Sequence, residues 1–310
     1  MKRLINRLIQ LVITLIGVSF LTFCLTYLSP GDPAAMVLEA SDTIVSQEVI
    51  EQTREEMGLN DPFLVQYGNW LLGVVQGDMG ISYSTKKPVM EKLMEGFAGT
   101  VLLALTTIIL IMVISIPLGI FSATHRNKIP DFFVRIFSFI GVSMPSFWVG
   151  LILLYIFGLK LGLVPIATAK VSFSGLILPA LTLAIYQSAK YTRQVRTVIL
   201  DELHQDYVIG ARARGLSEKA ILWKHILPNA ILPLITLLGM SIGWLLGGVA
   251  VIETVFSWPG IGKMAVQAIT MRDYPLIEGI VLWIATAYTV INFLVDLSYS
   301  YLDPRIKKEN

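Results

Sequence analysis

Long runs without an ionisable side chain divide the chain into six apolar stretches. They comprise residues 8–31, 96–124, 136–159, 171–189, 226–252 and 279–295. A helix crosses the hydrocarbon of a bilayer with roughly 20 residues, and charged side chains are costly inside it. The pattern therefore predicts an all-α polytopic membrane protein, a single domain over residues 1–310 with six transmembrane helices. We expect these helices near residues 8–29, 99–123, 133–158, 176–197, 229–252 and 277–301.

Composition supports the membrane assignment. Hydrophobic residues make up 55% of the chain and charged residues 15%, whereas soluble proteins carry about 25% charged residues. This balance excludes a disordered chain and argues against an ordinary cytosolic enzyme. Cys24 is the single cysteine, so no internal disulfide can form. The net charge of +2 gives no indication of a nucleic-acid partner.

The distribution of basic residues predicts the orientation of the helices. Sixteen of the 24 Lys and Arg residues fall in segments that are cytoplasmic if both termini are cytoplasmic. Because positive residues concentrate on that side, we expect a multi-pass protein with both termini in the cytoplasm. The basic start at residues 2–7 precedes an apolar run too long for a signal peptide, so we assign this run to the first helix.

The first external segment, about residues 30–95, is acidic, with eleven Asp and Glu residues against four basic ones. It predicts a small external cap of amphipathic helices around residues 47–57 and 88–95. Its apolar part, residues 62–77, contains Pro62 and three glycines and is too short to span a bilayer. We therefore expect this part to lie at the interface or against the protein.

Catalytic and metal-binding motifs are missing from the sequence. It contains no Walker loop, no HExxH or GxSxG motif and no Cys/His cluster. We therefore expect neither an enzyme nor a metal or cofactor bound by this chain. The predicted spans contain few carboxylates, which weakens an ion-coupled secondary carrier without excluding it. A membrane-embedded enzyme, the other alternative, would need a catalytic constellation that the sequence does not show.

The third predicted helix contains a potential break at Ser143, Met144 and Pro145. Proline with small neighbours frees backbone groups in a membrane helix, and these need a partner in the bundle or a wet cavity. A kinked helix that lines a pathway and a simple packing kink are both consistent with this pattern. The turn after the fifth predicted helix contains Glu253 and Trp258. We name these five residues as candidate pathway or gate residues.

The segment between the fourth and fifth predicted helices, about residues 198–228, carries the clearest local pattern. We expect two short helices joined at Gly215, Leu216 and Ser217, since glycine suits the position after a helix C-cap and serine can cap the next helix. Small residues and arginines alternate before this junction, at Gly210, Ala211, Arg212, Ala213 and Arg214. They leave a slim surface that another protein can approach closely, although a solvated basic loop is the alternative.

The same segment contains a longer pattern, at Asp206–Val208, Ala211–Leu216 and Leu227–Ala230. This pattern resembles the cytoplasmic signature of permease subunits of bacterial ABC importers. The chain departs from that signature at Ile209, Gly210 and His225, as is typical of the dipeptide/oligopeptide/nickel branch. It also resembles that branch at Gly31–Pro33, Gly141–Pro145, Glu253–Gly262, Arg272–Pro275 and Leu302–Arg305. The stretch 131–148 is most similar to nickel or metal-chelate permeases.

The resemblance implies a type I ABC importer permease fold in the bacterial cytoplasmic membrane. The chain would be one of two permease subunits, expected as a heterodimer, surrounded by membrane lipid. Two ATPase subunits would bind ATP and Mg²⁺, and an extracytoplasmic binding protein would deliver nickel or a metal chelate, with di- or oligopeptides as the alternative substrate. The residues expected to form the ATPase-coupling loop are Ala211, Arg212, Ala213, Arg214, Gly215, Leu216 and Ser217.

Overall fold

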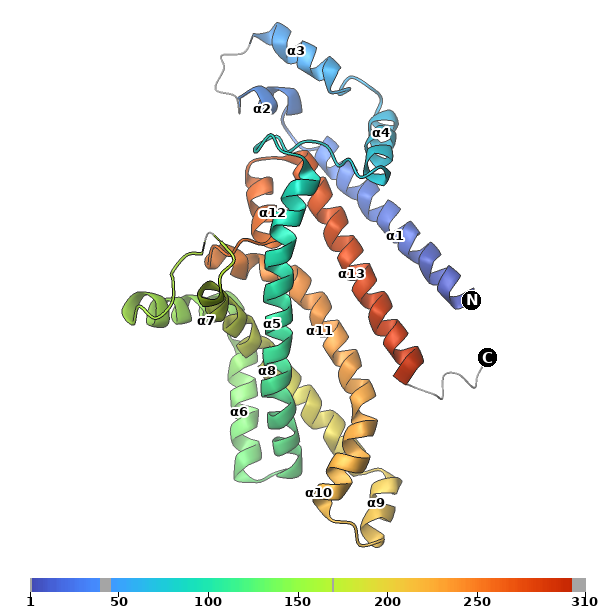
Figure 1. Ribbon diagram of the computed structural model, residues 1–310, viewed down its shortest axis with the longest axis vertical. Helices are drawn as coiled ribbons and strands as arrows, with labels where there is room; N and C mark the ends of the chain where they lie inside the picture. Colours follow the sequence, from blue (N-terminus) through green and yellow to red (C-terminus); the bar gives the residue numbers. More distant parts are fainter. Residues whose placement is uncertain (1, 40–45, 169, 303–310) are drawn as a thin grey trace. The chain divides into compact units, whose positions relative to one another are not determined.

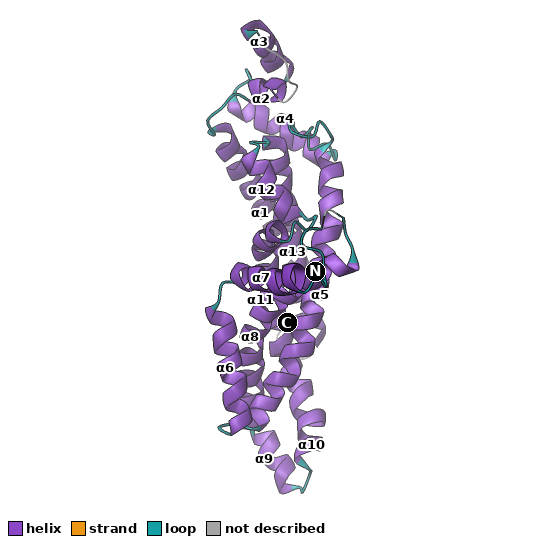
Figure 2. Ribbon diagram, turned by 90° about the vertical axis from the view of Figure 1, so that its left-hand side faces the viewer, coloured by secondary structure: helices purple, strands orange, loops and turns teal. Residues whose placement is uncertain are grey.

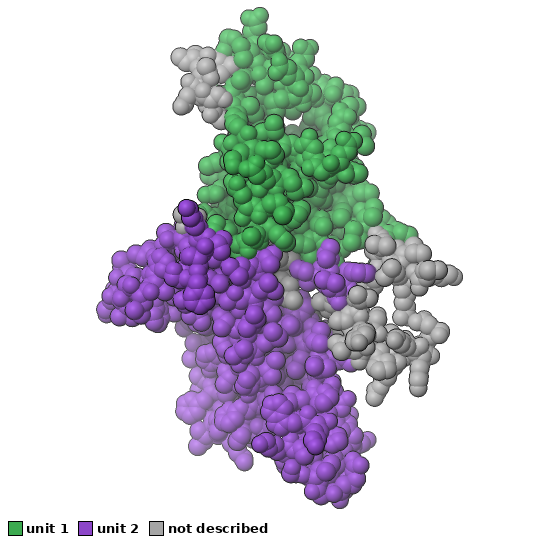
Figure 3. Space-filling model, viewed as in Figure 1, with its two compact units in different colours: residues 1–100, 259–289 green, residues 101–258, 290–310 purple. Residues whose placement is uncertain are grey.

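Helices make up the regular structure of the described residues, apart from an isolated antiparallel bridge between Ile81 and Pro88 (Figure 1 and Figure 2). The computed structural model describes residues 2–39, 46–168 and 170–302. Most of the terminal Leu302–Arg305 motif therefore lies outside the described residues. The chain forms two units, one of residues 1–100 and 259–289 and the other of residues 101–258 and 290–310 (Figure 3).

The first unit combines two long helices with several short ones. The long helices are α1 (Lys2–Tyr27) and α13 (Tyr274–Leu302), the latter up to residue 289. The short helices are α2 (Pro33–Glu39), α3 (Gln47–Glu56), α4 (Phe63–Val75) and α12 (Ile261–Thr270), and α5 (Val89–Thr124) contributes its first turns. Aromatic rings pack α4 against α1, with the ring centroids of Phe23 and Trp70 5.7 Å apart.

The second unit contains the rest of α5, the end of α13 and the helices between α5 and α12. These are α6 (Ile129–Ser143), α7 (Ser146–Leu153), α8 (Phe173–Leu203), α9 (Asp206–Ala213), α10 (Glu218–Ile221) and α11 (Leu227–Val255). Two π-helical turns, η1 (Leu154–Lys160) and η2 (Leu222–Ile226), extend α7 and join α10 to α11. The helix pair α9 and α10 forms one end of this unit, remote from α7 (Figure 1).

The centre of the second unit is α8. Fifteen of its 31 residues are buried, and it packs against α6, α7 and α11. The Ser115 hydroxyl of α5 donates a hydrogen bond to the Ser188 carbonyl of α8 at 3.2 Å. Gly141 allows α6 to approach closely, because a Cβ at this position would lie 2.5 Å from the Cβ of Ala189. Neighbouring helices therefore cover much of α8, so the covered part of its surface does not face lipid.

Four helices are long and apolar enough to cross a membrane among the described residues. They are Ile9–Tyr27, Val89–Thr124, Glu218–Gly239 and Tyr274–Leu294. A fifth span results if Ile129–Ser143 and Ser146–Lys160, which meet at 99°, are counted together. The remaining expected span, residues 176–197, coincides with α8, which does not qualify and whose second half contains Lys190, Arg193 and Arg196. Lys190 and Arg193 are exposed, and Arg196 is paired with Asp131, which explains why this polarity is tolerated.

Two helix boundaries differ from the sequence-based expectation. α5 begins at Val89 instead of near residue 99, so the segment 88–95 is not a separate helix of a cap. Pro88 precedes it directly and Glu91 lies in its first turn, both of which favour a helix start. The expected helix over 133–158 is divided at Met144, whose extended backbone is the conformation that a following proline favours.

A buried carboxylate joins three helices of the second unit. Asp131 at the start of α6 has no exposed surface. It accepts hydrogen bonds from the Arg196 guanidinium of α8 at 2.8 and 2.9 Å and from the Ser122 hydroxyl of α5 at 2.5 Å. The backbone N–H of Asn127 donates a further bond at 2.9 Å. A buried charge is tolerated only when it is paired and hydrogen-bonded, and these four bonds meet that condition.

We predict that Asp131→Asn destabilises the protein. The amide keeps the shape of the side chain but leaves Arg196 without a counter-charge. We expect a loss of about 3 kcal/mol in the free energy of unfolding, the lower end for a broken buried pair, because Arg196 keeps some solvent access. Unfolding of the purified protein in detergent measures this change. Glu91→Gln, which breaks an exposed pair with Lys87, is the control and should lower the free energy of unfolding much less; equal losses would contradict the prediction.

Candidate functional site

The helix pair α9 and α10 forms a rigid turn, which we call the α9–α10 hairpin (residues 206–221). Gly215 has a φ of 81°, a conformation that glycine adopts without strain. Its N–H bonds to the Arg212 carbonyl at 2.9 Å, and the N–H of Leu216 bonds to the Ala211 carbonyl at 3.3 Å, which is the pattern of a Schellman C-cap. The Ser217 hydroxyl accepts from the N–H of Ala220 and caps α10. The glycine and serine thus have the local roles predicted for them.

An ion pair joins the two helices of the hairpin. The Arg212 Nε and Nη2 atoms lie 2.6 and 3.0 Å from the two carboxylate oxygens of Glu218. The hydrogen bond to Glu218 raises the pKa of Arg212 above its ordinary value. Arg214 donates to the Gly210 carbonyl at 3.3 Å. Both arginines therefore have partners inside the hairpin.

The hairpin is anchored on one side and exposed on the other. Val208, Ala211 and Ile221 are buried and fix it to the rest of the unit. Six of the seven candidate coupling residues are exposed, namely Arg212, Ala213, Arg214, Gly215, Leu216 and Ser217. No atom lies within 4 Å of the position of a Cβ added at Gly210 or Gly215. The surface around these two glycines is therefore open to close approach by another molecule.

The five candidate pathway residues fall into two groups in the second unit. Ser143 and Pro145 are exposed at the break between α6 and α7, and Met144 between them is half-buried. Glu253 and Trp258 at the end of α11 have no exposed surface. The backbone N–H of Trp258 donates to the Glu253 carbonyl at 2.8 Å, which tightens the turn after α11. The sequence did not predict that this second group would be buried.

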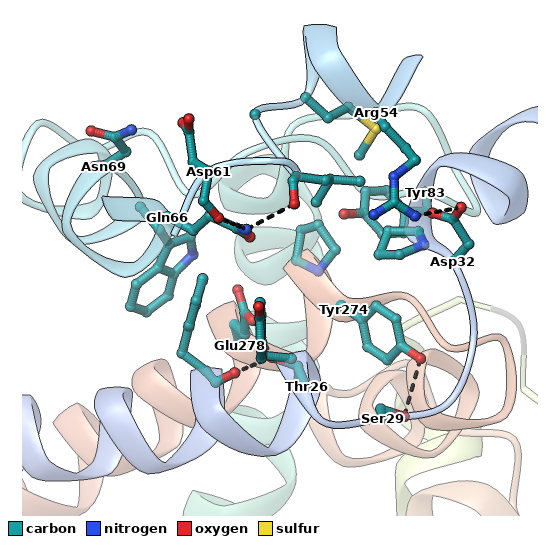
Figure 4. A pocket seen from close by; sticks show the side chains of 18 of the residues that line it. Thr26, Ser29, Asp32, Arg54, Asp61, Gln66, Asn69, Tyr83, Tyr274 and Glu278 are labelled. Atoms are coloured by element: carbon teal, nitrogen blue, oxygen red, sulfur yellow. Dashed lines mark hydrogen bonds and ion pairs between the residues drawn. The ribbon is translucent and has the colours of Figure 1, made fainter. Parts of the chain in front are cut away.

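The first unit contains a cleft of about 600 Å³ that the sequence did not predict. The cleft is bordered by the ends of α1, α3 and α13 and by α4. Its aromatic residues are Phe23, Tyr27, Trp70, Tyr83 and Tyr274, and its charged residues are Asp32, Arg54, Asp61 and Glu278. Figure 4 shows Arg54 and Asp61 above the opening in that view and Thr26 and Glu278 below it. Ligand sites have this size and this mixture of apolar walls and few polar groups.

Three contacts fix the charged lining of the cleft. Arg54 lies 3.0 Å from the Asp32 carboxylate, so these two charges offset each other. The Thr26 hydroxyl of α1 donates to the Glu278 carboxylate of α13 at 2.5 Å. Tyr274 donates to the Ser29 hydroxyl at 3.1 Å. Thr26 and Glu278 are 252 positions apart, so only the folded chain brings them together.

A second buried aspartate positions Tyr83 in the wall of the cleft. Asp273, just before α13, has no exposed surface and accepts four bonds from residues 82–84 at 2.6–3.0 Å. One of these donors is the backbone N–H of Tyr83 itself. Burial, followed by the charges of Glu278 and Asp273, raises the pKa of the Tyr83 phenol well above its ordinary value. The phenol therefore stays neutral and can donate a hydrogen bond.

Comparison with a solved structure shows the fold. The chain resembles a chain of the MetNI methionine ABC transporter in an inward-facing conformation, with a TM-score of 0.58 at 18% identity. The match covers 69% of this chain and 97% of that chain. The fold is thus that of an all-helical type I importer permease, as predicted.

Comparison of sequences gives the family. Residues 115–308 match the family described as binding-protein-dependent transport system inner membrane component, and residues 1–106 match its N-terminal family. The chain belongs to this family of permease subunits of ABC transporters. It is a multi-pass inner-membrane protein, is not itself an enzyme and binds no cofactor. The family implies an ATPase, another permease and a binding protein as partners.

Three curated relatives match almost the whole chain. The oligopeptide transport system permease protein AppB of Bacillus subtilis (strain 168) is 40% identical, over 98% of both chains. The dipeptide transport system permease protein DppB of Alkalihalophilus pseudofirmus is 36% identical, over 97% of this chain and 98% of its own. The glutathione transport system permease protein GsiC of Escherichia coli (strain K12) is 36% identical, over 98% of each. The substrates in the names of these relatives give no support to nickel and favour the alternative prediction of peptides.

Proposed function

We propose that this chain is a permease subunit of an ATP-driven importer of short peptides. The observation that carries the proposal is its full-length similarity to permeases named for oligopeptides, dipeptides and glutathione. The expectation of nickel rested on the stretch 131–148. In this stretch Asp131 is bound by Arg196, so its carboxylate has a packing role. The described residues contain no group of three or more His, Cys, Asp or Glu side chains that could hold a metal ion.

We also propose that the α9–α10 hairpin is the element that couples this chain to an ATPase subunit. Its exposed glycines allow close contact, and Ile209, Leu216 and Trp223 expose apolar surface beside them. α8 leads directly into the hairpin and α11 follows it through η2. A displacement of the hairpin would therefore move two long helices of the second unit. This arrangement suits a switch between two states of the permease that nucleotide binding biases.

The third proposal concerns the five candidate pathway residues. The break at Ser143–Pro145 exposes a non-helical backbone within the second unit, and Glu253 and Trp258 stabilise the turn after α11. We propose that the break faces the pathway formed with a second, different permease subunit. Both termini would lie in the cytoplasm, on the side of the hairpin.

Deletion of this permease should abolish the uptake of short peptides and leave nickel uptake unchanged. The measurement is the uptake of labelled tripeptide and of nickel by the deletion strain and by the strain complemented with the intact chain. Vesicles that contain all subunits should also need ATP for peptide uptake, which an ion-coupled carrier would not. Lost nickel uptake with normal peptide uptake would contradict the substrate assignment.

A bulky side chain on the α9–α10 hairpin should uncouple the permease from its ATPase subunits. We predict that Gly210→Trp and Gly215→Trp leave the permease inserted but reduce co-purification of the ATPases and ATP-driven uptake by about tenfold or more, because the added ring occupies the space of a partner. Arg212→Gln should be milder, since its exposed pair with Glu218 contributes about 0–1 kcal/mol.

Two variants distinguish the effect of added bulk from the effect of backbone strain at Gly215. Gly210 is helical, so Gly210→Trp adds bulk without the positive φ of Gly215. Gly215→Asn tests the positive φ with a small side chain that tolerates this conformation. We expect Gly215→Asn to retain most of the uptake. Normal transport by both tryptophan variants would show that the hairpin is not the coupling element.

A further inference from the structure

We propose that the cleft of the first unit binds the free α-ammonium end of a short peptide, with Glu278 as the group that recognises the charge. The inference rests on the proposed peptide-import function and adds a substrate site on the permease itself.

The balance of charge in the cleft favours a cation. Its described lining residues include three carboxylates, Asp32, Asp61 and Glu278, and one guanidinium, Arg54. Arg54 is held by Asp32 at 3.0 Å and is therefore not available to attract an anionic ligand. Two carboxylates remain without a basic side chain in the lining. A ligand that enters with its positive end first is thus preferred over one that enters with a carboxylate.

Glu278 is the group best placed to recognise that positive end. Its residue surface is only 6% exposed, yet it borders the cleft. Within the described part of the chain its carboxylate accepts one hydrogen bond, from Thr26 to Oε1, and forms no ion pair. A buried carboxylate without a cation is costly, and the cleft is the direction from which a cation can reach it. Figure 4 shows Glu278 at the floor of the cleft, beside Thr26.

The walls distinguish an organic ammonium from a metal ion. The described residues contain no group of carboxylates, imidazoles or thiols close enough together to hold a metal. Five aromatic rings line the cleft instead, and ring faces attract ammonium groups. Tyr83 offers a neutral phenol, so a peptide carbonyl can find a hydrogen-bond donor in the wall. A volume of about 600 Å³ suits a ligand of a few residues.

The test measures peptide binding to the complete importer in nanodiscs without the binding protein. The probe is labelled tri-alanine, compared with N-acetyl-tri-alanine, which lacks the ammonium. We expect saturable binding of tri-alanine and a loss of roughly tenfold or more on acetylation, because a charge-assisted contact is removed. Glu278→Gln should cause a similar loss for tri-alanine and little change for the acetylated peptide.

Two further variants serve as controls for Glu278→Gln. Glu278→Asp retains the charge and should bind tri-alanine better than Glu278→Gln. Glu48→Gln removes an exposed carboxylate of α3 outside the cleft and should bind as the unaltered protein does. Thermal unfolding of each variant checks that it is folded. Equal binding of tri-alanine and its acetylated form, or binding unchanged by Glu278→Gln, would overturn the proposal.

ATP-driven uptake separates this inference from the function on which it rests. If the complete importer transports tri-alanine while Glu278→Gln changes neither binding nor uptake, only the cleft assignment fails. If the importer with its binding protein does not transport peptides at all, the proposed function fails first. Saturable binding of Ni²⁺ that depends on Glu278, with no binding of tri-alanine, would overturn both.

Discussion

A carboxylate enclosed among helices has to be compensated by the groups around it, and this constraint organises both units. Asp131 is compensated by Arg196 and holds α5, α6 and α8 together at one level. Asp273 is compensated by hydroxyls and backbone N–H groups and holds residues 82–84 against the start of α13. Among the described residues, Glu278 has one hydrogen-bond donor, the Thr26 hydroxyl. The first two acids thus stabilise the fold, and the third is left available for a ligand.

In the second unit, one part stabilises the fold and another, under the proposed function, passes on a displacement from the ATPase. Its stable part is α8 with its covering helices, whereas the α9–α10 hairpin projects from it on buried contacts of Val208, Ala211 and Ile221. The Schellman turn at Gly215 and the pair of Arg212 with Glu218 make the hairpin stiff. A stiff element between two long helices can pass a displacement to both. Under the proposed function, this geometry matters more than the charge of the exposed arginines.

Local patterns in the sequence predicted local structure well. Gly215, Ser217 and Pro145 act through neighbours a few residues away, so the hairpin turn and the break in the third helix could be predicted. Contacts between distant residues could not: Arg196 lies 65 positions from Asp131, and Glu278 lies 252 from Thr26. The early start of α5 was missed because its first turns carry charged residues that a search for apolar runs excludes. Apolarity also predicted α8 as a span, but its second half carries the exposed Lys190 and Arg193 and the paired Arg196.

Cysteine accessibility tests the coupling account most directly. In a Cys24→Ser background, Ala213→Cys places a single thiol on the exposed hairpin, and Gln52→Cys places one on exposed α3. The reagent is a membrane-impermeant maleimide, applied to right-side-out and inside-out vesicles that contain the importer. The account predicts that position 213 reacts only in inside-out vesicles, and only after the ATPases are stripped away, while position 52 reacts only in right-side-out vesicles. Labelling of position 213 from outside, or labelling unaffected by the ATPases, would contradict it.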